Sequence, residues 1–253
     1  IGIGGGVICD LTGFVSSIYM RGIDFGFIPT TLLAMTDASI GGKNGVNLNT
    51  IKNIIGVIND PKFIFIDYSF LNTLPNKDWL NGFAEIIKHA CISSNNLFDF
   101  LENNANIFRS YDSCKNSLEF DQLVFDSISI KLDFVKSDKT ELGRRKFLNF
   151  GHTFGHAIES KYSLTHGESI SLGIVFANHI ANKLNILSYK EMEKVKNILS
   201  SYLLPVDISA FNKESLVDLI YNDKKSFNDK IDLIFINKIG SSLIHNIKIK
   251  DIF

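Results

Sequence analysis

The stretch "IGIGGGVICDLTGF", residues 1–14, decides how the first part of the chain folds. A short apolar run leads into three consecutive glycines, and a segment with helical character follows them. Glycines in this context let backbone N–H groups approach a phosphate at the N-terminus of a helix. A tight strand-to-helix turn without a ligand explains the same glycines equally well, so both interpretations stay open for the loop taken alone.

Short apolar runs alternate with turn residues as far as residue 75, for example in "FGFIPTTLLA" and "KFIFID". Buried strands interleaved with helical segments favour parallel pairing in an α/β unit. We therefore expect residues 1–75 to form part of an α/β domain with parallel strands. Because Ile1 is not Met and the first residues resemble the end of a buried strand, we also expect the N-terminal part of this domain to be missing.

The pattern of apolar residues changes at residue 76, and from there on it has helical periodicity. In "WLNGFAEIIKHACI" the apolar residues recur at helical spacing, and further helical patterns occupy residues 95–108, 119–137, 147–160, 167–187, 189–202 and 213–222. The closing segments "IDLIFI" and "LIHNIKI" predict two short strands. Residues 76–253 are therefore expected to form a mainly α-helical domain.

The composition, charge and cysteine pattern of the chain limit the classes of protein to which it can belong. The chain of 253 residues is 45% hydrophobic and 21% charged, which is typical of a soluble globular protein, and its formal net charge of -1 gives no sign of nucleic acid or an anionic membrane as partner. No uncharged apolar run reaches the roughly 20 residues of a membrane helix, and no signal peptide is recognisable. Cys9, Cys91 and Cys114 lie outside any CxxC pattern, so we expect reduced, buried thiols and a cytoplasmic location.

A dense polar cluster follows the first apolar segments, in "PTTLLAMTDASIGGKNGVN" and then "IKNIIG". Lysines supply charge and the adjacent Gly41 and Gly42 allow close backbone approach, so the cluster predicts a loop shaped around an anionic or polyhydroxyl ligand. A solvated surface loop is the alternative. The polar members of the cluster are Thr30, Thr31, Asp37, Lys43, Asn47, Lys52 and Asn53.

Three of the six histidines fall within fifteen residues, at 152, 156 and 166. His152 and His156 would share one helix face, as two zinc ligands can, but the residues between them lack the glutamate of an HExxH motif. Glu85, among apolar neighbours in "GFAEIIKH", is costly to bury without a partner, although a surface ion pair with Lys88 would also account for it. A structural role is the default for any one histidine, but the group favours a metal site.

Taken together, these segments resemble the 3-dehydroquinate synthase family of sugar phosphate cyclases. They occur in the family's order and cover most of residues 1–178, while "DKK" at 223–225 fits more weakly. The glycine loop is shared with the related glycerol dehydrogenase group, where "GHTFGHAIE" together with "GGKNGVN" is not typical. The matching segments are "GGGVICDLTGF", "RGIDFGFIPTTLLAMTDASIGGKNGVN", "KNIIG", "LNTLP", "GFAEIIKH", "LNFGHTFGHAIES" and "HGES".

The resemblance implies an NAD- and metal-dependent lyase that converts 3-deoxy-D-arabino-heptulosonate 7-phosphate to 3-dehydroquinate and phosphate. It implies that residues 1–75 are a truncated Rossmann-like, NAD-binding domain and that residues 76–253 are a mainly α-helical domain that binds zinc and substrate. It implies zinc or cobalt held by Glu85, His152 and His166, which leaves coordination positions open for substrate oxygens. His156 would then face the substrate as a hydrogen-bonding or proton-transfer residue. A homodimer acting on a small-molecule substrate is the expected assembly.

The resemblance also implies two sets of contact residues. Those toward NAD are Gly6, Val7, Ile8, Cys9, Asp10, Thr30, Thr31, Asp37, Lys43, Lys52, Phe70, Leu71, Asn72 and Thr73. Those toward the substrate are Arg21, Lys43, Lys52, Asn53, Lys88, Lys131, Glu141, Arg145, Asn149 and Lys225. The guanidinium fork of Arg145 suits a carboxylate and so favours the keto acid. Cys9 departs from the family pattern, which has glycine there.

Three alternatives stay open. A 2-deoxy-scyllo-inosose synthase would keep NAD and zinc and change the substrate, whereas a metal-dependent polyol dehydrogenase would accumulate NADH. A non-catalytic remnant is the third, because the intact metal-ligand set argues against loss of the metal site but not against loss of NAD binding. Family members carry strands and helices ahead of the glycine loop that help to hold the adenosine end of NAD. The chain is therefore a fragment of an ordinary enzyme, or it binds NAD more weakly, or a separate piece supplies the half-domain; we expect a fragment.

Overall fold

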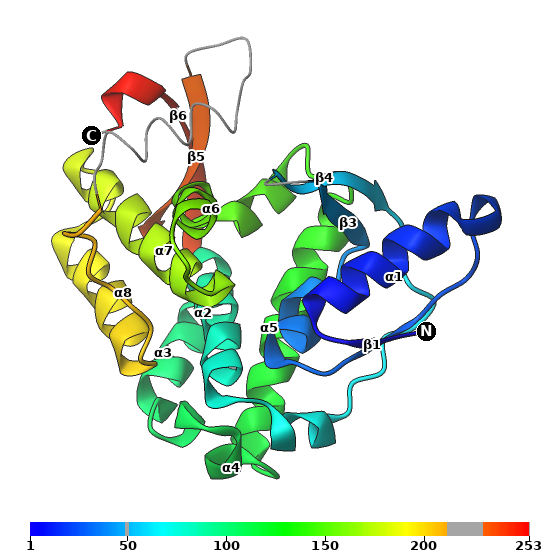
Figure 1. The fold of residues 1–253 in the computed structure, drawn as a ribbon. Helices are drawn as coiled ribbons and strands as arrows, with labels where there is room; N and C mark the ends of the chain where they lie inside the picture. Colours follow the sequence, from blue (N-terminus) through cyan, green and yellow to red (C-terminus); the bar gives the residue numbers. More distant parts are fainter. Residues whose placement is uncertain (49–50, 212–229, 253) are drawn as a thin grey trace. The chain divides into compact units, whose positions relative to one another are not determined.

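A computed structural model of the chain describes residues 1–48, 51–211 and 230–252. The chain divides into two compact units, coloured along the sequence in Figure 1. The first unit combines residues 1–85 with 107–145, and the second combines 86–106 with 146–253. The chain thus returns once to the first unit after residue 85, a crossing that the expected division after residue 75 does not include.

The first unit begins with a parallel strand pair in which Gly2 lies opposite Phe27, and Phe27 also forms a parallel bridge with Ile64. This pairing agrees with the α/β expectation. Within the described residues, the parallel sheet contains only β1 and β2 besides the bridge at Ile64, so a Rossmann fold stays an expectation. The elements of this unit are β1 (Gly2–Gly4), α1 (Gly6–Ile18), η1 (Tyr19–Arg21), β2 (Phe27–Pro29), η2 (Ala34–Ala38), β3 (Lys43–Leu48), β4 (Ile51–Ile58), η3 (Tyr68–Thr73), the first part of α2 (Asn76–Ser93), η4 (Ile107–Arg109), α4 (Tyr111–Cys114) and α5 (Leu118–Ser137).

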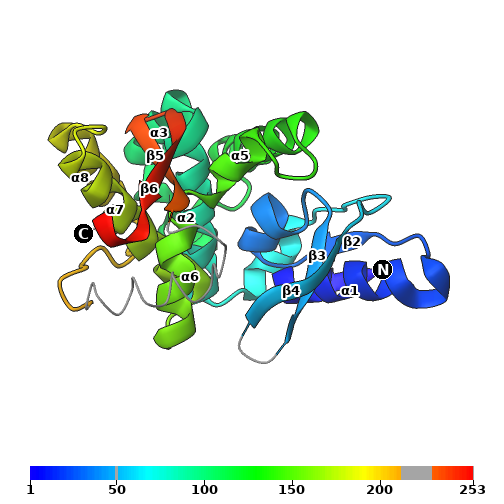
Figure 2. The same cartoon turned by 90° about the horizontal axis from the view of Figure 1, so that it is seen from above.

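The prediction of a loop over "GGKNGVN" is wrong beyond Gly41 and Gly42. The residues after these two glycines form β3, which pairs with β4 in an antiparallel hairpin alongside α1 (Figure 2). Gly41 and Gly42 make the turn into β3 with φ of 102° and 67°, values that suit glycine. Val46 and the β-branched residues of β4 favour strand over loop. In the sequence, the polar residues that lie between these β-branched residues make the preference for a strand hard to recognise.

An aromatic cluster anchors the start of α2 in the first unit. The ring of Trp79 lies 5.3 to 5.7 Å from those of Phe83, Tyr111 and Phe120, and its Nε1 donates a 2.8 Å hydrogen bond to the carbonyl of Phe108. A buried indole usually finds such a partner for its N–H. The cluster therefore fixes the helix that carries Glu85 against α4 and α5.

The second unit is mainly helical, as expected, and ends in an antiparallel hairpin with Lys230 opposite Lys248, which confirms the two predicted C-terminal strands. The helix predicted from residue 147 starts later, because Gly151 has φ of 79° and interrupts it. The helix predicted at 213–222 lies outside the described residues. Besides the end of α2, the elements are α3 (Asn95–Asn104), η5 (Arg144–Asn149, entered from the first unit), α6 (His152–Lys161), α7 (His166–Lys183), α8 (Tyr189–Ser201), β5 (Lys230–Lys238), β6 (Ser241–Lys248) and η6 (Ile249–Asp251).

All three cysteines are buried and free, as the sequence predicts. Burial raises the pKa of Cys9 to about 11, so this thiol is neutral at physiological pH. In the described part of the chain, no helix is both long enough and apolar enough to cross a membrane.

Candidate active site

The glycine loop joins β1 to α1 in a tight turn. A side chain on Gly4 would place its Cβ 2.7 Å from Cβ of Ile8, and one on Gly5 would lie 3.2 Å from Cγ2 of Thr31. Gly5 is the N-cap of α1 and brings no side chain to satisfy the first N–H groups of the helix. The backbone here therefore fits an anionic group such as a pyrophosphate.

Asp10 lies in the second turn of α1, beside the charges of Lys131 and Asp37. Burial raises its pKa to about 6, while the positive charge of Lys131 lowers it and the carboxylate of Asp37 raises it. The folded chain therefore holds a proton on Asp10 at pH values where the unfolded chain has released it.

Replacing Asp10 with asparagine should make the protein more stable near neutral pH. Between about pH 4 and pH 6 the folded state binds more protons at Asp10, so the free energy of unfolding falls as pH rises, and the loss is complete above pH 6. Two pKa units represent roughly 3 kcal/mol. Solvent screening of this half-buried side chain leaves a gain of about 1–2 kcal/mol for Asp10→Asn at about pH 7, and almost none below about pH 4.

Urea unfolding at several pH values measures this difference, and Asp67→Asn is the control of opposite sign. Hydrogen bonds from Ser69 lower the pKa of Asp67, so its replacement should reduce stability near neutral pH. A gain for Asp10→Asn that is equal at pH 4 and pH 7 would show that changed packing, not ionisation, sets the effect.

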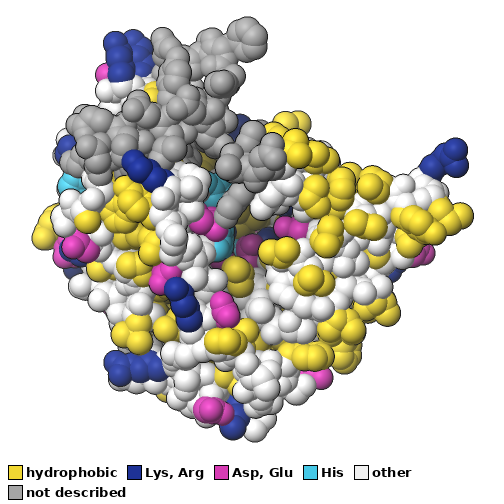
Figure 3. All heavy atoms as spheres, in the orientation of Figure 1, with side chains coloured by type: hydrophobic (Ala, Val, Ile, Leu, Met, Phe, Trp, Pro, Cys, Tyr) yellow, Lys and Arg dark blue, Asp and Glu magenta, His cyan; other side chains and the backbone are white. Residues whose placement is uncertain are grey.

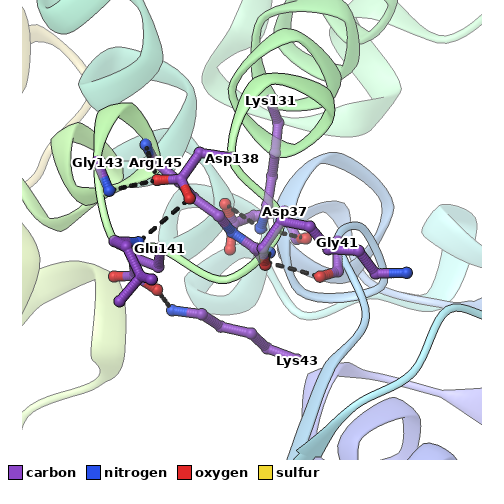
Figure 4. Close-up of polar contacts among 10 residues, drawn as sticks. Asp37, Gly41, Lys43, Lys131, Asp138, Glu141, Gly143 and Arg145 are labelled. Atoms are coloured by element: carbon purple, nitrogen blue, oxygen red, sulfur yellow. Dashed lines mark hydrogen bonds and ion pairs between the residues drawn. The ribbon is translucent and has the colours of Figure 1, made fainter.

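Lys131 and Asp37 form an ion pair in the first unit (Figure 4). Nζ of Lys131, on α5, lies 2.7 Å from Oδ1 of Asp37 and 2.5 Å from its backbone carbonyl, on the π-helix η2. Both were predicted as site residues from segments 94 positions apart. The pairing lowers the free-energy cost of burying Lys131, because a paired charge costs far less to bury than a single one.

Arg145 is buried and binds backbone carbonyls (Figure 4). Nη2 donates to the carbonyl of Gly41 at 2.8 Å, and Nη1 donates to that of Lys139 at 2.7 Å. A Cβ on Gly41 would lie 2.6 Å from Nη2, so the glycine is required for this approach. Burial lowers the pKa of Arg145, while the charges of Asp37, Asp60 and Asp138 raise it. The guanidinium is thus held in place and still charged.

Lys43 and Glu141 make a second ion pair in the same region (Figure 4). Lys43 begins β3, and Glu141 follows α5 with φ of 61°. The first unit therefore gathers three cations predicted to bind substrate, and carboxylates hold two of them. An anionic ligand could replace these carboxylates as the partner of the lysines.

The other predicted residues of the first unit lie near the ends of short elements. The N–H of Thr30 donates to the carbonyl of Gly4 at 2.9 Å, and Oγ1 of Thr31 accepts from the N–H of Ala34 at 3.1 Å, which ties this turn to the glycine loop. Asn53 lies on β4 with φ of 48°, and Arg21 is exposed on η1. Phe70, Leu71, Asn72 and Thr73 lie on η3, and the side chain of Lys52 lies outside the described residues.

Three histidines lie together in the second unit. His152 starts α6, His156 follows one turn later and His166 starts α7. The ring centroids of His152 and His166 are 5.8 Å apart, and that of His156 lies 5.2 Å from the first and 6.3 Å from the second. Neutral imidazoles gathered in this way fit a divalent metal such as zinc.

Glu159 orients one of these rings. Its Oε2 lies 3.3 Å from Nδ1 of His166, and the carboxylate is largely buried. A carboxylate that accepts from one ring nitrogen fixes the tautomer and leaves the other nitrogen for a metal. No role was predicted for Glu159 from the sequence. Its position one turn after His156, on the same helix face, is the signal that could have indicated one.

Glu168, also in the second unit, caps the N-terminus of α7. Its Oε2 accepts from the N–H of Thr165 at 2.7 Å, and Oγ1 of Thr165 accepts from the N–H of Glu168 at 3.4 Å. This is a capping box, so "THGES" fixes the start of α7 and with it the backbone of His166.

Glycines bring α6 and α7 into direct backbone contact. A Cβ on Gly173 would lie 2.0 Å from the carbonyl oxygen of Gly151 and 2.7 Å from the nitrogen of Gly155. Ordinary side chains would separate the two helices by more than this. The contact therefore holds the histidine of one helix beside that of the other.

Three further predicted residues belong to the second unit or to its undescribed part. Lys88 is buried on α2, Asn149 ends η5, and Lys225 lies outside the described residues. Glu85 is buried and belongs to the first unit, while His152 and His166 belong to the second. The ligand set that combines them stays a prediction from the sequence.

Comparison with family models gives two adjoining matches that together cover residues 1–226. The model described as 3-dehydroquinate synthase N-terminal matches residues 1–81, and that described as 3-dehydroquinate synthase C-terminal matches residues 82–226. The 3-dehydroquinate synthase of Campylobacter fetus subsp. fetus is 43% identical over 249 residues, which are 97% of this chain and 70% of that protein.

Solved structures of two cyclases share the fold. The 2-epi-5-epi-valiolone synthase of Streptomyces hygroscopicus subsp. jinggangensis 5008, with NAD+ and Zn2+ bound, gives a TM-score of 0.90 at 27% identity and covers 99% of this chain and 70% of that chain. A 2-deoxy-scyllo-inosose synthase complexed with carbaglucose-6-phosphate, NAD+ and Co2+ gives 0.87 at 26% identity, with 99% and 71% covered.

Proposed function

Because the chain belongs to the 3-dehydroquinate synthase family, we propose that it converts 3-deoxy-D-arabino-heptulosonate 7-phosphate to 3-dehydroquinate and phosphate. This is the second step of the shikimate pathway toward aromatic amino acids. We choose this substrate because the chain is 43% identical to a 3-dehydroquinate synthase but only 27% and 26% identical to two cyclases with other products. A homodimer in the cytoplasm is the assembly and location that we propose with it.

Zinc or cobalt would be held by Glu85, His152 and His166. The convergence of two imidazoles in the second unit supports this assignment, as does the carboxylate of Glu159 on the ring of His166. His156 would stay off the metal and donate or accept a proton at the substrate. Asn149, next to these histidines in sequence, would add an amide hydrogen bond to a substrate hydroxyl.

NAD would lie along the glycine loop, with its pyrophosphate at the backbone of Gly6 to Asp10. When bound, NAD supplies a transient oxidation of the C5 hydroxyl and zinc polarises the oxygen at that carbon, so that phosphate elimination, re-reduction and an intramolecular aldol closure can follow. Cys9 replaces a family glycine, and its side chain is buried in a core cluster with Phe25 and Phe27.

The cations of the first unit would receive the two anionic groups of the substrate. Arg145 is held by two backbone carbonyls, and the guanidinium N–H groups that these carbonyls do not use would bind a carboxylate or phosphate. Lys131 and Lys43 are each held by a carboxylate, so substrate binding would exchange one anion for another at lysines that are already ordered. Arg21 and Lys52 are the further proposed cations of the first unit, with Asn53 and Glu141 as polar contacts. Lys88 of the second unit and Lys225 complete the proposed set.

Product analysis tests the proposal. Purified protein with NAD, zinc and the heptulosonate phosphate should release phosphate and 3-dehydroquinate in equal amounts, without net growth of the nicotinamide absorbance of NADH. Turnover of glucose 6-phosphate in its place would favour a 2-deoxy-scyllo-inosose synthase, and steady accumulation of NADH would favour a polyol dehydrogenase. Zinc binding without either product would identify a non-catalytic remnant.

A further inference from the structure

A cavity of about 580 Å³ lies in the second unit, lined by residues of α7, of α8 and of the segment 206–211. We call it the α7–α8 cavity. Sites for small molecules usually measure about 300–1,000 Å³ and combine an apolar lining with a few well-placed polar groups. The apolar part of this lining consists of Val175, Met192, Val206, Ile208 and Phe211.

The α7–α8 cavity is separate from the histidine cluster. Asn178, which lines the cavity, lies twelve residues after His166 on the same helix. At a rise of about 1.5 Å per residue, this spacing corresponds to about 18 Å along the axis of α7. A ligand in the cavity would therefore not touch the residues that are predicted to hold the metal.

Asn178 places an unpaired hydrogen-bond acceptor at the cavity. The residue is 1% exposed, and its Oδ1 accepts no hydrogen bond from any part of the chain that the structure describes. The adjacent Ala177 and the nearby Ile174 are buried apolar residues of the same helix. Asparagine is a poor helix former, and a buried acceptor without a partner lowers stability. A ligand that donates a hydrogen bond to Oδ1 would remove this cost.

The charged groups of the cavity favour a cationic ligand. Two carboxylates and one ammonium group line it, on Glu193, Asp207 and Lys196. Hydrogen bonding by Ser209 lowers the pKa of Asp207, and the charge of Lys196 lowers it further, so this carboxylate already has partners. Over α8, Figure 3 shows acidic and basic side chains among the hydrophobic ones. In the described ranges, the side chain of Glu193 makes neither a hydrogen bond nor an ion pair, so its carboxylate can attract a cation.

An aromatic ring completes the lining and is itself held in place. The ring centroid of Phe211 lies 5.0 Å from that of Tyr162 and 6.1 Å from that of Phe176, both at edge-to-face angles. Aromatic rings pack well against further flat rings and also attract cations.

We propose that the α7–α8 cavity binds an organic ammonium ion whose flat apolar body carries a hydrogen-bond donor. The body would lie against Met192, Ile208 and Phe211. Its donor would reach Oδ1 of Asn178, and the ammonium group would lie at Glu193. An anionic ligand would meet two carboxylates and only one ammonium group.

Three related compounds test the chemistry of the ligand by isothermal titration calorimetry. Tryptamine, which has an indole N–H and an ammonium group, should bind at one site per chain. 1-Methyltryptamine lacks the N–H and should bind about tenfold more weakly, because the acceptor of Asn178 stays unpaired. Indole-3-propionate carries a carboxylate in place of the ammonium group and should bind more weakly still, because of repulsion from Glu193 and Asp207.

Two variants test the position of the ligand. Asn178→Leu, of similar size, should weaken tryptamine binding about tenfold and abolish the preference over 1-methyltryptamine. Without ligand it should unfold at a higher urea concentration, because no buried acceptor is left unpaired. Glu193→Gln should also weaken tryptamine binding about tenfold. Glu102→Gln is the matched control, since Glu102 on α3 of the same unit pairs with Lys194, and it should bind as the unaltered chain does.

Four outcomes would overturn the proposal. They are the absence of tryptamine binding at millimolar concentration, equal binding of indole-3-propionate, and tryptamine binding that Asn178→Leu and Glu193→Gln leave unchanged. The fourth is displacement of tryptamine by zinc, which would place the compound at the histidines and not in the cavity. These measurements involve neither substrate nor NAD, so they are independent of the proposed function.

Discussion

Replacing His152 with alanine should remove nearly all bound zinc, whereas replacing His156 should leave the metal content close to that of the unaltered protein and lower turnover. The two rings are only 5.2 Å apart on α6, so position alone does not separate their roles. Loss of one of three protein ligands disables a zinc site. Loss of a general acid or base costs about 10²–10⁴-fold in rate without that effect.

Metal analysis of dialysed protein and steady-state phosphate release measure the two effects. His245→Ala is a suitable control, because His245 lies on β6 against the ring of Phe235 and should change neither quantity. Equal loss of zinc from the His152→Ala and His156→Ala proteins would instead establish two zinc ligands spaced four residues apart on one helix.

Gly173→Ala should destabilise the protein by about 3 kcal/mol or more, although alanine is the better helix former by about 1 kcal/mol. The added Cβ would lie 2.0 Å from the carbonyl oxygen of Gly151, and a backbone atom cannot turn aside as a flexible side chain can. Helices α6 and α7 must then move apart. Because each carries one of the converging imidazoles, zinc affinity should fall in parallel.

Urea unfolding and competition with a chelator provide the two measurements. Gly143→Ala is the matched control, since the nearest atom to its Cβ would be Oδ2 of Asp138 at 3.7 Å, an ordinary contact. If Gly173→Ala unfolds at the same urea concentration as Gly143→Ala and retains its zinc affinity, the close backbone contact does not position the histidines.

Much of the secondary structure could be predicted because it follows from local pattern. Helical periodicity identified α5, α7 and α8 to within a few residues, and the β-branched closing segments identified β5 and β6. The hairpin of β3 and β4 could not be recognised in the same way, because its polar side chains outweighed its β-branched ones. The late start of α6 depends on the left-handed backbone of Gly151, which no periodicity reveals.

The residues of the candidate site also fall into two groups, those that short sequence spacing brings together and those that only the fold brings together. The three histidines could be grouped from sequence because short spacing and the α6–α7 hairpin bring them together. The contacts of Lys131 with Asp37 and of Arg145 with Gly41 join residues 94 and 104 positions apart, so only the folded chain shows them. These contacts show that two cations predicted to bind substrate are held by a carboxylate and by backbone carbonyls in the folded chain.

The aromatic cluster at the start of α2 has an optical consequence. Trp79 is the only tryptophan of the chain, and its indole is buried in the first unit. Its emission should shift to longer wavelength only when that unit opens to water. Fluorescence therefore reports on the first unit alone, while circular dichroism follows the helices of both. Two unfolding curves from one sample would show whether the units melt in concert or one after the other.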